Sequence, residues 1–179
     1  MNWLARSTVI CDIWPFMPET MEYDIRPACE SDISAIYRLI GDLAEYEHLG
    51  AMMVSTEEDL GAVLFGADAF VEVLVAEVVG QVVGFALFYK TFSTFVGRPG
   101  LYLEDLYVVP EYRGRGVGKG LLSRLATLAL EREYGRLEWS VLNWNAPAIE
   151  FYCAHGARAM TDWTVYRLSG DAVAALAKE

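Results

Sequence analysis

LEDLYVVPEYRGRGVGK, residues 103–119, joins an apolar strand pattern to a glycine-rich turn and then to a helical pattern. Pro110 ends the strand pattern because proline cannot donate to a sheet ladder. In the turn, Gly114, Gly116 and Gly118 let backbone amides approach a ligand without a Cβ in the way. The helix start adds unpaired N–H groups and a partial positive charge. The stretch therefore predicts an anion site between a strand and a helix.

Spacing excludes two common phosphate-binding loops. A Walker A loop requires a glycine at the position of Arg113, and a dinucleotide fingerprint that starts at Gly114 requires its third glycine at Lys119. The remaining pattern is Arg-x-x-Gly-x-Gly, from Arg113 to Gly118. Taken alone, this pattern also suits a plain turn before a helix.

The charge around this turn differs from that of the rest of the chain. The first 112 residues contain 5 Lys/Arg and 18 Asp/Glu, whereas the remaining residues contain 9 and 7. No acid lies between Arg113 and Leu130, and that window contains four basic residues, Arg113, Arg115, Lys119 and Arg124. A local basic site on an acidic protein favours a small phosphorylated ligand over nucleic acid, which needs a broad basic surface.

Length and composition indicate one soluble domain. The chain has 179 residues, of which 54% are hydrophobic and 22% charged, and no uncharged run reaches the roughly 20 residues of a membrane span. Three scattered cysteines and two distant histidines lack metal-ligand spacing. We therefore expect reduced cysteines, no metal, no membrane association and a cytoplasmic location.

Residues 1–20 lack hydrophobic periodicity, and the stretch that begins at Met21 resembles the N-terminus of a protein. We interpret residues 1–20 as a disordered extension or a start-site artefact, and residues 21–179 as a single domain.

Hydrophobic periodicity predicts the order of elements in that domain. The expected strands are residues 23–26, 70–78, 82–89, 101–109, 137–142, 158–160 and 163–168, with a tight turn over 79–81 and a loop over 91–100. The expected helices are residues 30–50, 55–66, 117–129, 145–156 and 171–178.

This order, with three motifs, resembles the GNAT superfamily of N-acetyltransferases. The motifs are residues 101–105 (LYLED), the Arg-x-x-Gly-x-Gly turn and residues 144–152 (WNAPAIEFY). Together they are similar to the spermidine/spermine (diamine) N-acetyltransferase branch and its thialysine-acetylating relatives. The resemblance implies an α/β (α+β) GNAT fold, with a mixed, mostly antiparallel central sheet of six to seven strands flanked by helices.

The resemblance also implies an activity: acetyl-CoA-dependent transfer of an acetyl group to a primary amine, by direct attack in a ternary complex. Glu104 would attract the ammonium and accept its proton, and Tyr152 would protonate the departing thiolate. Purely structural roles for these two residues remain open. Glu104 could be a structural carboxylate paired with an arginine, and Tyr152 could be aromatic core. Cys153 and His155 are too close on a short helix to face each other as a catalytic pair.

Binding residues follow from the same resemblance. The expected acetyl-CoA contacts are the backbone of Leu106, Tyr107 and Val108, the turn residues Arg113, Gly114, Arg115, Gly116, Val117, Gly118 and Lys119, and Asn145, Ala146, Pro147 and Ala148. The expected amine pocket comprises Tyr46, Glu47, Glu104, Glu138, Trp139 and Ser140.

Ser93 and Phe95 stand where the polyamine enzymes carry an acid and a tryptophan. We therefore expect a small amine, such as a diamine or a thialysine-like amino acid, rather than spermine. Two alternatives are a non-catalytic acyl-CoA-binding module and a protein N-acetyltransferase. By resemblance we also expect a homodimer in which residues 163–168 pack between subunits.

Overall fold

The computed structural model describes residues 21–178, so the extension predicted for residues 1–20 lies outside the described part. The chain divides into two compact units, with the boundary in the sequence between Ser140 and Val141. Each unit is described by itself.

A five-stranded sheet forms the centre of the first unit, in the order β1-β2-β3-β4-β5. The first three pairings are antiparallel, and β5 runs parallel to β4. The strands are β1 (Asp24–Pro27), β2 (Val71–Val78), β3 (Gln81–Ser93), β4 (Arg98–Val108) and β5 (Leu137–Trp139). The mixed, mostly antiparallel character was predicted correctly.

The prediction of six to seven strands was wrong. Within the described chain, residues 158–160 and 163–168 form no strand, and β5 ends at Trp139 rather than at Leu142. A strand needs a neighbouring edge for its backbone hydrogen bonds. An apolar, β-prone sequence is therefore not enough to form one.

The loop expected over residues 91–100 is also mostly strand. Ser93 at the end of β3 pairs with Arg98 at the start of β4, so the turn shrinks to residues 94–97. Gly97 takes a φ of 68°, a left-handed value that suits glycine, and the Val96 N–H donates to Ser93 Oγ at 3.3 Å. The polar composition of residues 91–100 predicted a loop, whereas the structure has a long β3–β4 hairpin there.

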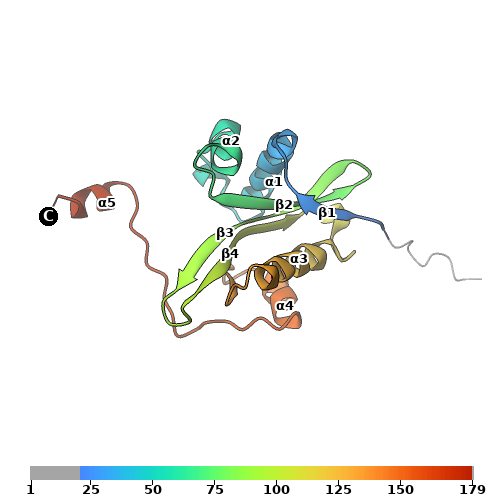
Figure 1. The fold of residues 1–179 in the computed structure, drawn as a ribbon. Coiled ribbons are helices and arrows are strands. Elements are labelled where there is room, and N and C mark those ends of the chain that lie inside the picture. Colours follow the sequence, from blue (N-terminus) through green and yellow to red (C-terminus); the bar gives the residue numbers. More distant parts are fainter. Residues whose placement is uncertain (1–20, 179) are drawn as a thin grey trace, which may run out of the picture. The chain divides into compact units, whose positions relative to one another are not determined.

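Helices cover both faces of the sheet in the first unit. Figure 1 shows α1 (Ile33–Tyr46) and α2 (Glu57–Phe65) on one face and α3 (Val117–Glu131) on the other. Short 3-10 turns precede α1 (Glu30–Asp32), follow it (Gly50–Met52) and precede the glycine-rich turn (Pro110–Tyr112). The first helix ends at Tyr46, earlier than predicted. The predicted cap of α2 is confirmed, because Thr56 Oγ1 accepts from the Asp59 N–H.

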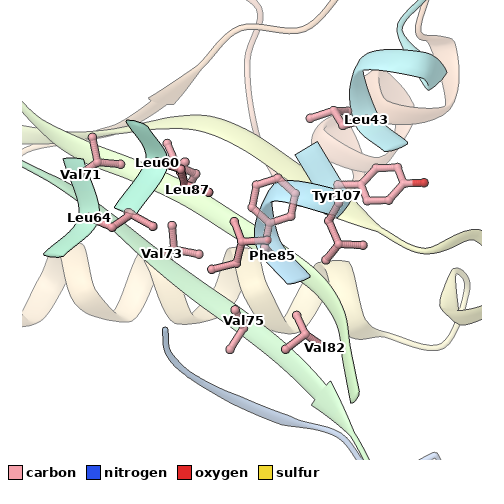
Figure 2. Packing of buried hydrophobic residues seen from close by; sticks show 12 residues of the cluster. Leu43, Leu60, Leu64, Val71, Val73, Val75, Val82, Phe85, Leu87 and Tyr107 are labelled. Carbon is pink, nitrogen blue, oxygen red and sulfur yellow. The ribbon is translucent and has the colours of Figure 1, made fainter. Parts of the chain in front are cut away.

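The hydrophobic core holds the helices on the sheet. Ile36 and Leu39 of α1 and Phe85 of β3 have no exposed surface. Figure 2 shows the cluster that they share with Leu43, Leu60, Leu64, Val71, Val73, Val75, Val82, Leu87 and Tyr107. On the opposite face, α3 buries Leu121 and Leu125 completely, as the apolar stripe predicted. Both ends of the glycine-rich turn are thus attached to rigid elements.

An ionic network fixes the edge of the sheet. Arg26 on β1 contacts Asp32 before α1 and Glu77 on β2, each at 2.7 Å. The Arg26 hydrogen bond is the main reason that the pKa of Asp32 falls to about 2.

In the second unit, the described residues 141–178 form two helices, α4 (Ala146–Ala154) and α5 (Asp171–Leu176). Asn145 caps α4 as predicted, since its side-chain oxygen accepts from the Ala148 N–H at 3.3 Å. Gly156 follows this helix with a φ of 88°. Across the described residues, no helix combines the length and apolarity that a membrane crossing would need.

Candidate active site

The turn between β4 and α3 has the geometry of an anion site. Gly114 and Gly116 have φ values of 71° and 88°, and Gly116 is the N-cap of α3. The first backbone N–H groups of this 15-residue helix have no partners within the helix. Tyr23 closes one side, because its hydroxyl donates to the Gly116 carbonyl at 3.1 Å. The predicted glycine turn therefore offers the donors that a phosphate requires.

Arg113 anchors the entrance of this turn. Its Nε donates to the Val108 carbonyl at 2.8 Å, and its guanidinium lies 5.0 Å from the ring centre of Tyr46 and 5.2 Å from that of Tyr107. The sequence placed Arg113 at the phosphates and Tyr46 at the amine, whereas the structure brings the two side chains together. Arg115 and Lys119 are exposed and remain accessible to an anion.

Part of β4 has an open edge beside this turn. It pairs with β5 only from Leu101 to Leu103, so residues 104–108 have β3 on one side and no β5 partner on the other. The Val109 N–H donates to β3. Because strand residues alternate, Tyr107 also directs its backbone groups toward β3, whereas Leu106 and Val108 direct theirs toward the open edge. An extended ligand can hydrogen-bond there.

A β-bulge places Glu104 next to this open edge. Leu87 pairs with Asp105 and the next β3 residue, Phe88, pairs with Leu103, so Glu104 is the extra residue. Bulges often re-aim side chains at active sites. The exposed Glu104 carboxylate accepts a hydrogen bond from Tyr89 at 3.1 Å. Burial, followed by the Glu104 charge, raises the pKa of Tyr89 to about 12, which keeps its hydroxyl protonated as a donor.

Asp105 is a site residue that sequence reasoning missed. Burial, followed by the negative charges of Glu104 and Glu47, raises the pKa of Asp105 to about 6. Glu47, at the end of α1, also has a raised pKa because of burial. Three carboxylates thus influence one region, which suits a cationic ligand. The sequence does indicate this site, because Glu104 and Asp105 are two adjacent acids inside an otherwise apolar strand.

The predicted β5 residues separate into two groups. Glu138 pairs with Tyr102 in the sheet, and the Tyr102 hydroxyl lies 2.8 Å from Ser140 Oγ, so Glu138 and Ser140 share the face of Tyr102. Strand alternation places Trp139 on the opposite face. Glu138 also contacts Arg136 at 2.6 Å and is therefore already ion-paired.

The remaining predicted residues lie in the second unit. Asn145, Ala146, Pro147 and Ala148 form the cap and first turn of α4, and Tyr152 lies in its last turn, half-buried against the ring of Phe151. His155 Nδ1 lies 2.7 Å from the Phe151 carbonyl, so this ring nitrogen donates to the backbone. This bond agrees with the rejection of a Cys153–His155 pair.

Comparison with protein families identifies the group to which this site belongs. A sequence model described as the acetyltransferase (GNAT) family matches residues 33–157. The chain belongs to the GNAT family of acetyltransferases. The sequence-based recognition is confirmed, and the protein is an N-acetyltransferase whose family implies acetyl-CoA as co-substrate.

The chain is also similar to individual proteins of known name and to solved structures. The chain is 42% identical over 164 residues to the thialysine N-epsilon-acetyltransferase of Bos taurus, covering 86% of this chain and 96% of the relative. It is 30% identical over 199 residues to the L-ornithine N5-acetyltransferase of Arabidopsis thaliana, covering 86% and 87%. Among solved structures, an integron cassette protein from the mobile metagenome of V. cholerae matches with a TM-score of 0.74 and 29% identity, covering 89% and 99%.

The residues of this GNAT protein fit acetyl-CoA. The left-handed glycines leave space beside the amides at the start of α3, and the open β4 edge lies next to them. Arg115 and Lys119 add positive charge. No cluster of His, Cys, Asp and Glu among residues 21–178 could hold a metal. The expectation of a metal-free enzyme stays a prediction.

Proposed function

We propose that this GNAT protein acetylates a side-chain primary amine of a small cationic substrate, a thialysine-like amino acid or a diamine, by direct attack in a ternary complex. The supporting observation is the group of three carboxylates, Glu47, Glu104 and Asp105, beside the open edge of β4. Relatives named for thialysine and ornithine acetylation support the same class of substrate.

Glu104 supplies the base in this proposal. A free alkylamine has a pKa of about 10.4, so the bound ammonium must lose a proton before it can attack. The carboxylate attracts the ammonium and accepts its proton, directly or through water. Tyr89 holds one carboxylate oxygen, Oε2, and leaves Oε1 for the substrate.

Tyr152 supplies the acid. A tyrosine hydroxyl, whose reference pKa in a free side chain is about 10, is suited to protonating a departing thiolate. The amides of residues 114–119 bind the phosphates, Leu106 and Val108 bind the pantetheine arm, and Asn145 to Ala148 contact the rest of CoA. These assignments rest on the resemblance together with the local geometry of each segment.

Two alternative functions are a non-catalytic acyl-CoA-binding module and a protein N-acetyltransferase. A non-catalytic acyl-CoA-binding module has no use for a bulge that presents Glu104 to solvent with a tyrosine donor on it. A protein N-acetyltransferase would acetylate peptides better than free amino acids.

The test is a thiol-release assay with acetyl-CoA. The panel contains thialysine, lysine, ornithine, putrescine, spermine and a lysine-containing peptide, each against a reaction without amine. We expect amine-dependent release that is fastest with the small amines. Release that does not depend on amine would contradict the proposal, and fastest release with the peptide would favour the protein acetyltransferase.

The enzyme is proposed to act as a homodimer. In the segment predicted to pack between subunits, Trp163 and Tyr166 are 71% and 92% exposed, and Val165 and Leu168 are exposed too. Contiguous exposed apolar side chains often mark protein contacts. Light scattering should report twice the chain mass, and a monomer at micromolar concentration would exclude the dimer.

A further inference from the structure

Three neighbouring strands carry polar side chains along one face of the sheet. The face can be followed from contact to contact: the rings of Tyr89 and Tyr102 lie 5.4 Å apart, and Tyr102 contacts Ser140. Strand alternation adds the residues two positions away on each strand. The polar face comprises Tyr89, Thr91 and Ser93 from β3, Arg98, Tyr102 and Glu104 from β4, and Arg136, Glu138 and Ser140 around β5.

Arg136 is the basic residue of this polar face that contacts both Glu138 and Ser93. Its Nε contacts Glu138 Oε2 at 2.6 Å, and its Nη1 donates to Ser93 Oγ at 3.1 Å. Ser93 is only 5% exposed, so its hydroxyl is held in place by its surroundings. The hydrogen bond to this hydroxyl therefore fixes the orientation of the Arg136 guanidinium. Arg136 is not buried, because 39% of its side chain is exposed.

The ion pair retains binding capacity on both sides. Among the residues that the structure describes, Nη2 of Arg136 has no acceptor and Oε1 of Glu138 has no donor. A guanidinium donor binds a carboxylate strongly, and a free carboxylate oxygen binds an ammonium. Together the two groups match a zwitterion.

Charge differs between the two ends of the polar face. Glu104 lies at one end, where its charge and that of Glu47 act on Asp105, and these carboxylates suit a lone ammonium. The Arg136–Glu138 pair makes the other end neutral overall but locally bipolar. A molecule that fits both ends has an ammonium at one terminus and a carboxylate next to an ammonium at the other.

The spacing also fits such a molecule. Glu138 pairs with Tyr102 on the neighbouring strand, about 4.8 Å away, and Glu104 lies two residues further along β4, which adds about 7 Å of strand. The backbones of Glu138 and Glu104 are therefore roughly 8 Å apart. An extended lysine side chain is about as long as two strand residues. A basic amino acid can therefore place its head group at the ion pair and its terminal amine at Glu104.

We propose that the Arg136–Glu138 ion pair, oriented by Ser93, is the subsite for the α-carboxylate and α-ammonium of a basic amino-acid substrate. This inference rests on the proposed acetyltransferase function and narrows its substrate class. Arg136 repels a second ammonium that lacks a neighbouring carboxylate, so diamines and polyamines are poorer substrates than amino acids of the same length.

The test compares three amines of matched length: lysine, 6-aminohexanoate, which lacks the α-ammonium, and cadaverine, which lacks the α-carboxylate. Arg136→Gln should lower kcat/KM for lysine and 6-aminohexanoate by roughly tenfold, the effect of one charge-assisted hydrogen bond, and leave cadaverine unchanged or improved. Glu138→Gln should lower kcat/KM for lysine more than for 6-aminohexanoate.

Arg38→Gln is the matched control, because it removes an exposed arginine from an ion pair with Asp42 on α1. It should leave all three values unchanged. Retained cadaverine turnover confirms that each variant is folded. If Arg136→Gln does not fold, Arg136→Lys, which keeps the charge but loses the planar fork, should weaken lysine relative to cadaverine in the same direction.

The outcomes separate this inference from the proposed function. An unchanged ratio of lysine to cadaverine in the Arg136 variants, or equal wild-type use of both amines, overturns the subsite and leaves the acetyltransferase standing. Absence of amine-dependent turnover with every amine overturns the proposed function, and the subsite with it.

Discussion

The Tyr89 hydroxyl donates a hydrogen bond to Oε2 of Glu104 across 3.1 Å, from β3 to the bulge of β4. The bulge turns Glu104 out of the regular ladder, and the tyrosine restrains the carboxylate after that turn. A side chain that a regular strand would leave mobile is thereby held beside the open edge.

Replacing Tyr89 with Phe tests whether this restraint serves the reaction. The variant keeps the ring packed on Tyr102 and loses only the donor. We expect kcat to fall by roughly tenfold, because a misplaced base transfers protons less efficiently, while KM for acetyl-CoA stays the same. Tyr37→Phe is the control, since it also loses one hydrogen bond, to the Ser55 carbonyl. Equal effects of the two variants would show that Tyr89 is only structural.

Asp105 should make the protein less stable as the pH rises. Its pKa is about 6 in the folded protein against an ordinary 3.8, so between these values the folded state binds more protons than the unfolded state. Its contribution is therefore complete below pH 3.8 and is lost as the pH rises through 6. Asp105→Asn should abolish this loss and raise stability at pH 8 by up to about 3 kcal/mol.

The measurement is the free energy of unfolding in urea from pH 4 to pH 8. The same variant should raise the KM for the amine, because one negative charge is gone. A wild-type curve that matches the Asp105→Asn curve over this range would show that Asp105 titrates normally.

Gly116→Asp should abolish acetyl-CoA binding. The substitution adds a Cβ at a φ of 88° and a negative charge at the amides proposed to bind phosphate. Gly97→Asp imposes similar strain at a φ of 68° in the β3–β4 turn and serves as the control. Calorimetry should detect binding only in the control. Unchanged affinity in folded Gly116→Asp would remove the turn from the CoA site.

Tyr152→Phe should reduce turnover by roughly 10²- to 10⁴-fold, the range for loss of a general acid. Affinity for acetyl-CoA should remain, because only the hydroxyl is deleted. Tyr37→Phe is again the control, because it deletes a tyrosine hydroxyl that donates to the Ser55 carbonyl and should have no effect on the chemical step. Turnover within a few-fold of the wild type would show that Tyr152 only packs against Phe151.

The motifs with local physical causes could be predicted from sequence. Gly116 and the Thr56 and Asn145 caps depend on neighbouring residues, and they lie where they were expected. The buried stripe of α3 follows from helical periodicity alone. Their common feature is that the determining interactions lie within a few residues.

Features that depend on distant pairing could not be predicted. The bulge at Glu104 exists only in the register of β3 against β4, and it decides which way the carboxylate points. Asp105 was missed because its environment includes Glu47, which is far away in sequence. The hairpin over residues 91–100 was concealed by polar residues, of which Ser93 is buried against Arg136.

The most direct test of the central claim is product analysis after reaction with acetyl-CoA and thialysine. Mass spectrometry and NMR should find one acetyl group on the side-chain amine for each CoA thiol released, with release slowed by roughly 10²-fold or more in Glu104→Gln. Acetate as the product, acetyl groups that stay on the protein, or an unaffected Glu104→Gln variant would contradict direct transfer to an amine held at Glu104.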